Sequence, residues 1–172
     1  MIKIKDRIIL GIISGILAGI PGRLINAVEY RFNLTDVKYG QMATNLFLPK
    51  GKINTPEGRS IASLVNHIMI SITGVITTYV LSATGRDKSI IKGIGVTSVF
   101  WLLFFGLSSR LSLQVKTKKP LSPLLSFMDH VTLGALNGMI IQKIGDDALF
   151  PDAEETYNTE KIPLFHTGET SE

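Results

Sequence analysis

Four apolar stretches, each long enough to cross a lipid bilayer, constrain this chain more than any other feature. They cover residues 8–29, 60–83, 89–108 and 121–145, and about 20 helical residues span the ~30 Å hydrocarbon core. Stretches of this kind fold as helices, because backbone polar groups in lipid must be satisfied within the segment. The hydrophobic content of 45% and the charged content of 19% agree with this class. The sequence therefore predicts an all-α polytopic membrane protein, a bundle of four transmembrane helices.

The remaining segments organise the chain into one transmembrane domain, residues 1–150, and a tail. Basic residues precede the first stretch as they do in a cleaved signal peptide, but no A-x-A site follows and the apolar pattern continues past Pro21. We therefore interpret this stretch as a span. The long polar connection before the second span is expected to hold a short interfacial helix at residues 39–48. Residues 151–172 are rich in acidic side chains and are predicted to be a disordered tail.

Glycines recur every four residues in the first and the last apolar stretch, which places them on one face of each helix. Small residues on such a face let two backbones approach closely, as is common where helices associate in lipid. We predict that the bundle packs through these faces and that the faces of the first and fourth spans contact each other. The glycines are Gly11, Gly15, Gly19, Gly134 and Gly138.

Polar and ionisable residues inside the spans mark the candidate functional site, because such residues are costly in lipid and usually have a role. Consecutive spans alternate in direction, so residues late in one span share a depth with residues early in the next. Most of the polar residues collect in this way in the half of the bilayer away from the N-terminus. The candidates for ligand binding or proton handling are Arg23, Asn26, Glu29, Asn66, His67, Asp129, His130 and Asn137.

Three interpretations of this cluster stay open. In the first, the groups only fix the register of the helices, and Arg23 pairs with Asp129 as an opposite charge at equal depth. In the second, the cluster lines a vestibule that binds or transports an ion, a proton or a lipid headgroup. In the third, His67, Asp129, His130 and Glu29 hold a metal ion in an intramembrane enzyme. The third lacks a HExxH motif, and adjacent helical residues such as Asp129 and His130 project about 100° apart.

We expect a non-enzymatic structural or interaction role, with no catalytic residue, no metal and no cofactor. The chain contains no cysteine, which excludes a thiol nucleophile and thiolate metal sites. It also has no glycine-rich phosphate loop between a strand and a helix and no serine nucleophile elbow. The sequence pI of 9.4 reflects bases that lie beside the spans, as expected next to anionic headgroups. The expected partners are membrane lipids, a second copy of the chain or another membrane protein, and no nucleic acid.

Several segments resemble the YqhR-type multi-pass membrane proteins of Firmicutes. They are GIISGILAGIPGRL in the first span, the following FNLTDV, SIIKGIGVTSVFWLLFFGLS in the third span, and the H-x-x-x-G-x-x-x-G spacing in the fourth. The resemblance covers most of residues 8–144. It implies a small bacterial membrane protein without an established activity, and it supplies no catalytic residues. The adjacent Asp129 and His130 and the acidic tail depart from the pattern.

The orientation is predicted from the first span. Lys and Arg residues are nearly equal in number on the two sides of the bundle, so their overall distribution does not decide it. The first helix usually dominates, and three of the first seven residues are basic. We therefore expect a protein of the cell membrane with both termini in the cytoplasm.

Overall fold

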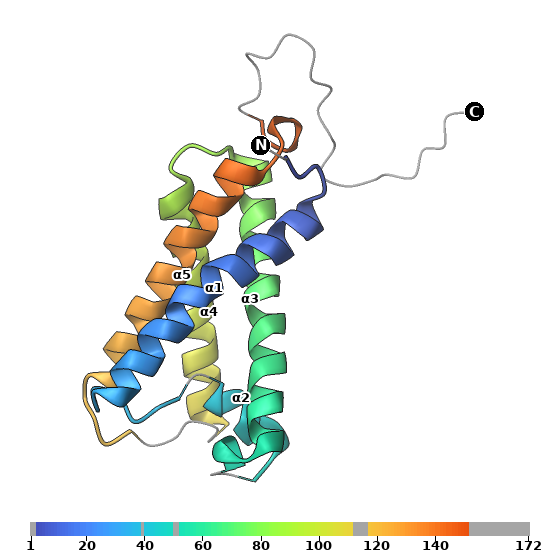
Figure 1. Ribbon diagram of the computed structural model, residues 1–172. Coiled ribbons are helices and arrows are strands. Elements are labelled where there is room, and N and C mark those ends of the chain that lie inside the picture. Colours follow the sequence, from blue (N-terminus) through green and yellow to red (C-terminus); the bar gives the residue numbers. More distant parts are fainter. Residues whose placement is uncertain (1–2, 39, 50–51, 112–116, 152–172) are drawn as a thin grey trace.

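Helices build the whole fold within the described part of the chain. The computed structural model describes residues 3–38, 40–49, 52–111 and 117–151. The four long helices are long and apolar enough to cross a membrane, which confirms the predicted all-α bundle of a multi-pass membrane protein (Figure 1). The helices are α1 (Arg7–Arg31), the short α2 (Gln41–Phe47), α3 (Pro56–Thr84), α4 (Ser89–Arg110) and α5 (Ser122–Ile144), with two 3-10 turns, η1 (Lys52–Asn54) and η2 (Asp147–Leu149).

Local capping signals set the helix boundaries. The Asp6 side chain accepts a hydrogen bond from the backbone of Ile9 at 2.8 Å and caps α1. Thr55 caps α3 in the same way, 3.1 Å from the Gly58 nitrogen, and Pro56 suits the first turn because it has no N–H to satisfy. The second span therefore begins at Pro56, earlier than the expected residue 60.

The other elements lie close to their predicted positions. The three remaining spans begin and end within two residues of the expected bounds. The short helix expected at residues 39–48 is α2, although residue 39 lies outside the described residues. α1 continues through Pro21 without interruption.

The four spans form two closely packed pairs. α1 packs along α3 and α4 packs along α5, while contact between α1 and α5 joins the pairs. The helices alternate in direction, and α1 crosses its neighbours diagonally (Figure 1). We call the end where α1 begins and α5 finishes the terminal end. The opposite end, where α1 and α4 finish and α3 and α5 begin, is the loop end.

The glycine face of α1 packs against α3. A Cβ on Gly15 would lie 2.1 Å from the carbonyl oxygen of Ile70, and a Cβ on Gly74 would lie 2.0 Å from that of Gly11. Gly19, one turn further, faces the Ile70 side chain. The two backbones approach this closely only because both surfaces lack side chains at the contact.

The glycine face of α5 packs against α4. A Cβ on Gly138 would lie 2.2 Å from the carbonyl oxygen of Ser89, and a Cβ on Gly93 would lie 2.2 Å from that of Gly134. The prediction that the glycine faces of the first and fourth spans contact each other was therefore wrong. Each face instead lies against a neighbouring helix that supplies a glycine of its own, Gly74 on α3 or Gly93 on α4.

A different face of α5 lies in the centre of the bundle. Leu133 packs with Ala18 of α1 and Ile70 of α3. Asp129 lies four residues earlier on the same face and is only 2% exposed. The helix contacts therefore direct Asp129 toward α1 and α3, while the glycines of α5 face α4.

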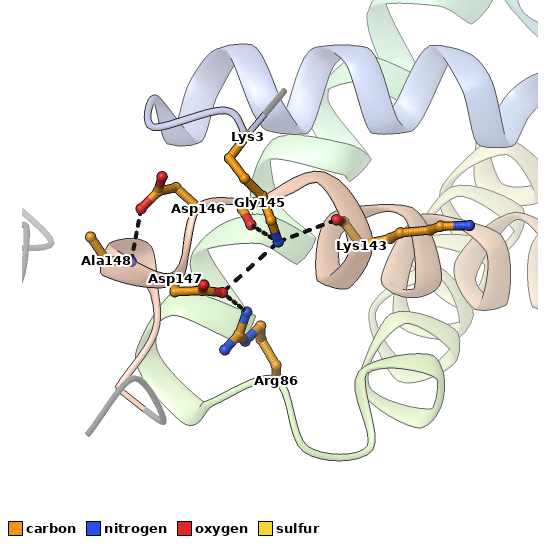
Figure 2. Close-up of polar contacts among 7 residues, drawn as sticks. All are labelled: Lys3, Arg86, Lys143, Gly145, Asp146, Asp147 and Ala148. Carbon is orange, nitrogen blue, oxygen red and sulfur yellow. Dashed lines mark hydrogen bonds and ion pairs between the residues drawn. The ribbon is translucent and has the colours of Figure 1, made fainter. Parts of the chain in front are cut away.

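Polar contacts close the terminal end (Figure 2). The Lys3 ammonium donates to the carbonyl oxygen of Gly145 at 3.1 Å and lies 3.9 Å from the Asp147 carboxylate. Arg86, in the turn between α3 and α4, forms an ion pair with the same carboxylate. These contacts therefore connect the segment before α1, the α3–α4 turn and η2. The predicted acidic tail follows η2, and residues 152–172 lie outside the described residues.

Candidate functional site

The polar residues that the sequence places at one depth separate into two groups around α1. Arg23 and Glu29 are six residues apart, which at about 100° per residue places them roughly 120° apart around the helix. Arg23 continues the line of Gly11, Gly15 and Gly19, so it faces α3. Glu29 is buried, with 7% of its surface exposed, and interacts electrostatically with Asp129 of α5.

Arg23 is held by two side chains of α3. Its Nη2 lies 2.9 Å from Nε2 of His67. The hydrogen-bond network assigns the amide oxygen of Asn66 to the side facing Arg23, where it accepts from Nε at 3.0 Å and from Nη2 at 2.8 Å. No described residue accepts a hydrogen bond from Nη1 of Arg23, so this nitrogen stays available as a donor.

His67 is a neutral ring in this arrangement. Its Nδ1 lies 2.7 Å from the carbonyl oxygen of Ser63, and because that oxygen can only accept, Nδ1 carries the hydrogen. Nε2 must then be the acceptor for Arg23, which only the neutral imidazole allows. The positive charge of Arg23 is therefore held by neutral partners and is not cancelled by them.

The predicted pairing of Arg23 with Asp129 was wrong. Within the described residues no carboxylate pairs with Arg23, whose partners are on α3. The two groups were expected to meet because the glycine faces beside them were expected to contact each other. Arg23 follows its glycine face toward α3, while Asp129 lies on a different face of α5 from Gly134 and Gly138.

Beside Arg23 the loop end contains a cavity of about 260 Å³, and most of the residues that line it are polar or charged. Lys38 reaches it from the segment after α1, with its ammonium 2.7 Å from Oδ1 of Asn54 and 4.6 Å from the centre of the Tyr30 ring. Arg59 in the first turns of α3 contributes a third positive charge. We call this space the basic cavity; it is lined by Arg23, Lys38, Asn54, Arg59, Ala62, Ser63 and Asn66.

Four residues that line the cavity were not predicted from the sequence: Lys38, Asn54, Arg59 and Ser63. The first two belong to a connection whose path the hydrophobic pattern does not specify. A usable signal was present, because both Arg59 and Ser63 precede Asn66 at helical spacing. That spacing places them on the face of α3 that receives Arg23.

The second group joins α1 to α5. The Asn26 amide hydrogen-bonds the Glu29 carboxylate and also donates to the carbonyl oxygen of Val37 at 3.4 Å. One oxygen of Glu29 and one oxygen of Asp129 are buried without a partner among the described residues. We call Glu29 and Asp129 the acidic pair; neither residue lines the basic cavity.

The last two candidates are bound locally. Nδ1 of His130 donates to the carbonyl oxygen of Ser126, one turn earlier on α5, at 2.7 Å. Asn137 is fully buried, and its amide donates to Oγ1 of Thr77 on α3 at 3.2 Å. Neither residue lines the basic cavity.

The four residues considered as metal ligands are not brought together. His67 faces Arg23, His130 bonds its own helix, and Glu29 and Asp129 form the acidic pair. Among the described residues, no three His, Asp or Glu side chains are grouped so that they could hold a metal ion. The enzyme interpretation therefore has no ligand set at the predicted place.

The connection that supplies Lys38 is anchored to the start of α5 through Asp36. This carboxylate accepts hydrogen bonds from the backbone nitrogen of Lys118 at 2.8 Å, from the Thr117 hydroxyl at 2.5 Å and from the Ser122 hydroxyl at 3.3 Å. Burial opposes ionisation of Asp36, but these hydrogen bonds together hold its pKa below the ordinary value. We call this contact the Asp36 anchor.

Comparison with known proteins identified no relative of this chain. No family model, no curated protein and no solved structure matches the chain. The resemblance to the YqhR-type proteins therefore rests on the sequence segments that suggested it, and the function has to be argued from the cavity itself.

Proposed function

We propose that this protein is a non-enzymatic, multi-pass protein of the bacterial cell membrane that binds a phosphate-bearing anion in the basic cavity. The resemblance to YqhR-type proteins supports a location in the bacterial cell membrane and membership of that family. The basic flank of α1 supports an orientation with both termini in the cytoplasm. The role is one of interaction, in which the cavity holds the phosphate group of a membrane component.

The charge of the basic cavity carries this proposal. Arg23, Lys38 and Arg59 line it, and none of the described lining residues is acidic. Nη1 of Arg23 is also free to donate, since the other two nitrogens of the guanidinium are bound by neutral groups. Charge-assisted hydrogen bonds from a guanidinium nitrogen to phosphate oxygens are among the strongest that proteins make.

The size of the basic cavity favours a phosphate ester over a halide ion. On the same measure of volume, a cavity of roughly 10–15 Å³ holds one water molecule, whereas this cavity measures about 260 Å³. The space therefore suits a group of several atoms. Asn54, Asn66 and Ser63 supply polar atoms for the oxygens of such a group.

Titration of the purified protein in a neutral detergent with sn-glycerol 3-phosphate, followed by calorimetry, tests this function. Arg23→Gln should weaken binding by about 10-fold or more, because hydrogen bonds to charged groups contribute roughly 1.5–3 kcal/mol. Arg59→Gln should weaken binding less, because Arg59 is exposed. The Arg59 side chain makes no hydrogen bond or ion pair within the described structure, and only its backbone nitrogen bonds the carbonyl oxygen of Thr55, so the variant should remain folded.

The matched control is Lys5→Gln, which removes one positive charge at the terminal end, far from the basic cavity. This variant should bind as the parent protein does. Saturable binding that is equal in the parent, Arg23→Gln and Arg59→Gln would contradict the proposal, and so would the absence of saturable binding in the parent.

A further inference from the structure

An apolar groove of about 400 Å³ lies on the outer side of α3, next to the basic cavity. Its walls include Ile12 of α1 and Leu64, Ile68, Ile72 and Ile76 of α3. Ile68 and Ile72 are 48% and 43% exposed, so they present open apolar surface on a helix that spans the membrane.

His67 connects the two spaces. Its ring lines the groove, while its Nε2 accepts the hydrogen bond from Arg23, which lines the basic cavity. Asn66 and Ser63, which line the basic cavity, are respectively adjacent to His67 and one turn before it. A ligand that fills both spaces would therefore pass directly over the contact between Arg23 and His67.

The direction of the groove matches the direction of a lipid chain. The basic cavity involves the first turns of α3 at the loop end, and the groove follows α3 from Leu64 to Ile76 toward the terminal end. The rise along the helix from Leu64 to Ile76 is about 18 Å. One leaflet contributes about half of the ~30 Å hydrocarbon core. The charged end therefore lies at the membrane surface and the apolar part runs toward the bilayer centre.

We infer that the ligand is an anionic glycerophospholipid of the leaflet at the loop end, with its phosphate in the basic cavity and one acyl chain in the groove. This inference rests on the proposed function, which requires only that the cavity binds a phosphate group. The positive charge at one end and the apolar walls beyond it fit an anionic amphiphile. His67 acts as a positioning residue, because it fixes the guanidinium of Arg23 at the junction.

The experiment compares two probes on the same detergent-solubilised protein: dioleoyl phosphatidylglycerol, measured by native mass spectrometry, and sn-glycerol 3-phosphate, measured by calorimetry. Ile72→Trp fills the groove with a larger side chain and should lower the affinity for the phospholipid about fivefold or more. It should leave the affinity for sn-glycerol 3-phosphate unchanged. Arg23→Gln should weaken the binding of both probes.

The matched control is Leu103→Trp, which adds the same bulk on α4 at a position that is 64% exposed and should not change either affinity. Binding of sn-glycerol 3-phosphate with no effect of Ile72→Trp on the phospholipid would overturn the inference and leave the proposed function standing. Equal affinity for dioleoyl phosphatidylcholine, which has a phosphate but no net charge, would also overturn the inference of an anionic lipid. The proposed function would be overturned separately, by a parent protein that does not bind sn-glycerol 3-phosphate.

Discussion

Asp36 lies outside the spans, and its ionisation affects stability through the Asp36 anchor. Its pKa is held below the ordinary Asp value of about 3.9 by the hydrogen bonds of the Asp36 anchor, which outweigh its burial. A carboxyl with a lowered folded pKa contributes stability that is fully present above its unfolded pKa and is lost as pH falls through the folded pKa. The anchor should therefore weaken below about pH 4.

We predict that Asp36→Asn lowers the melting temperature at neutral pH and that its difference from the parent shrinks as pH falls below about 4. Thermal unfolding of both proteins in detergent between pH 7 and pH 3 measures this difference. Other carboxyls titrate equally in both proteins, so the comparison isolates Asp36. A difference that stays constant down to pH 3 would show that the anchor does not depend on the charge of this residue.

At the scale of single residues, the sequence predicted how deep each polar residue lies in the bilayer better than it predicted which residues that residue contacts. Arg23, Asn66 and His67 do come together, as their positions in the spans require. The predicted partner of Arg23, Asp129, was wrong. The depth of a residue follows from its position in the span, whereas the helix that it faces depends on how the spans are arranged around one another. The small faces of α3 and α4, marked by Gly74 and Gly93, decide that arrangement, and no partner helix had been predicted for either glycine.

At the scale of the elements, the glycine contact between α1 and α3 and the one between α4 and α5 should each stabilise the bundle. Gly93 and Gly95 are two residues apart on α4, but a Cβ on Gly93 would lie 2.2 Å from the Gly134 carbonyl oxygen, whereas nothing lies within 4 Å of one on Gly95. We predict that Gly93→Leu lowers the stability of the bundle by at least 1–3 kcal/mol, the usual cost of overpacking. Gly95→Leu should leave it nearly unchanged.

The equivalent change on the other helix pair is Gly15→Leu, which would push α1 away from Ile70 of α3. It should destabilise the bundle to a similar degree. Thermal unfolding in a single detergent ranks the three variants. Equal stability of Gly93→Leu and Gly95→Leu would mean that close approach of α4 to α5 does not hold this pair together.

Helix positions were predictable because length, hydropathy and capping residues are local properties. Thr55 and Pro56 show the limit of this reasoning, since a cap that lies outside the apolar run extends α3 beyond the hydrophobic pattern. The path of the connection between α1 and α3 was not predictable, because side-chain contacts such as the Asp36 anchor determine it. The basic cavity was missed for that reason, as Lys38 belongs to this connection.

At the scale of the whole molecule, the alternating spans place the basic cavity at the loop end, opposite the start of α1 and the end of α5 (Figure 1). With the termini in the cytoplasm, the basic cavity would face the outer leaflet. The absolute orientation thus decides which leaflet supplies the ligand. The positively charged flank of α1 favours the cytoplasmic side for Lys3, Lys5 and Arg7.

We predict that a cysteine at position 118 is labelled by a membrane-impermeant maleimide in intact cells, and that a cysteine at position 5 is labelled only after the cells are permeabilised. The chain has no cysteine of its own, so Lys5→Cys and Lys118→Cys each carry one reactive thiol. Both positions are exposed and lie at opposite ends of the bundle, which makes them matched reporters. Labelling of Lys5→Cys in intact cells, with Lys118→Cys protected, would reverse the orientation and assign the basic cavity to the inner leaflet.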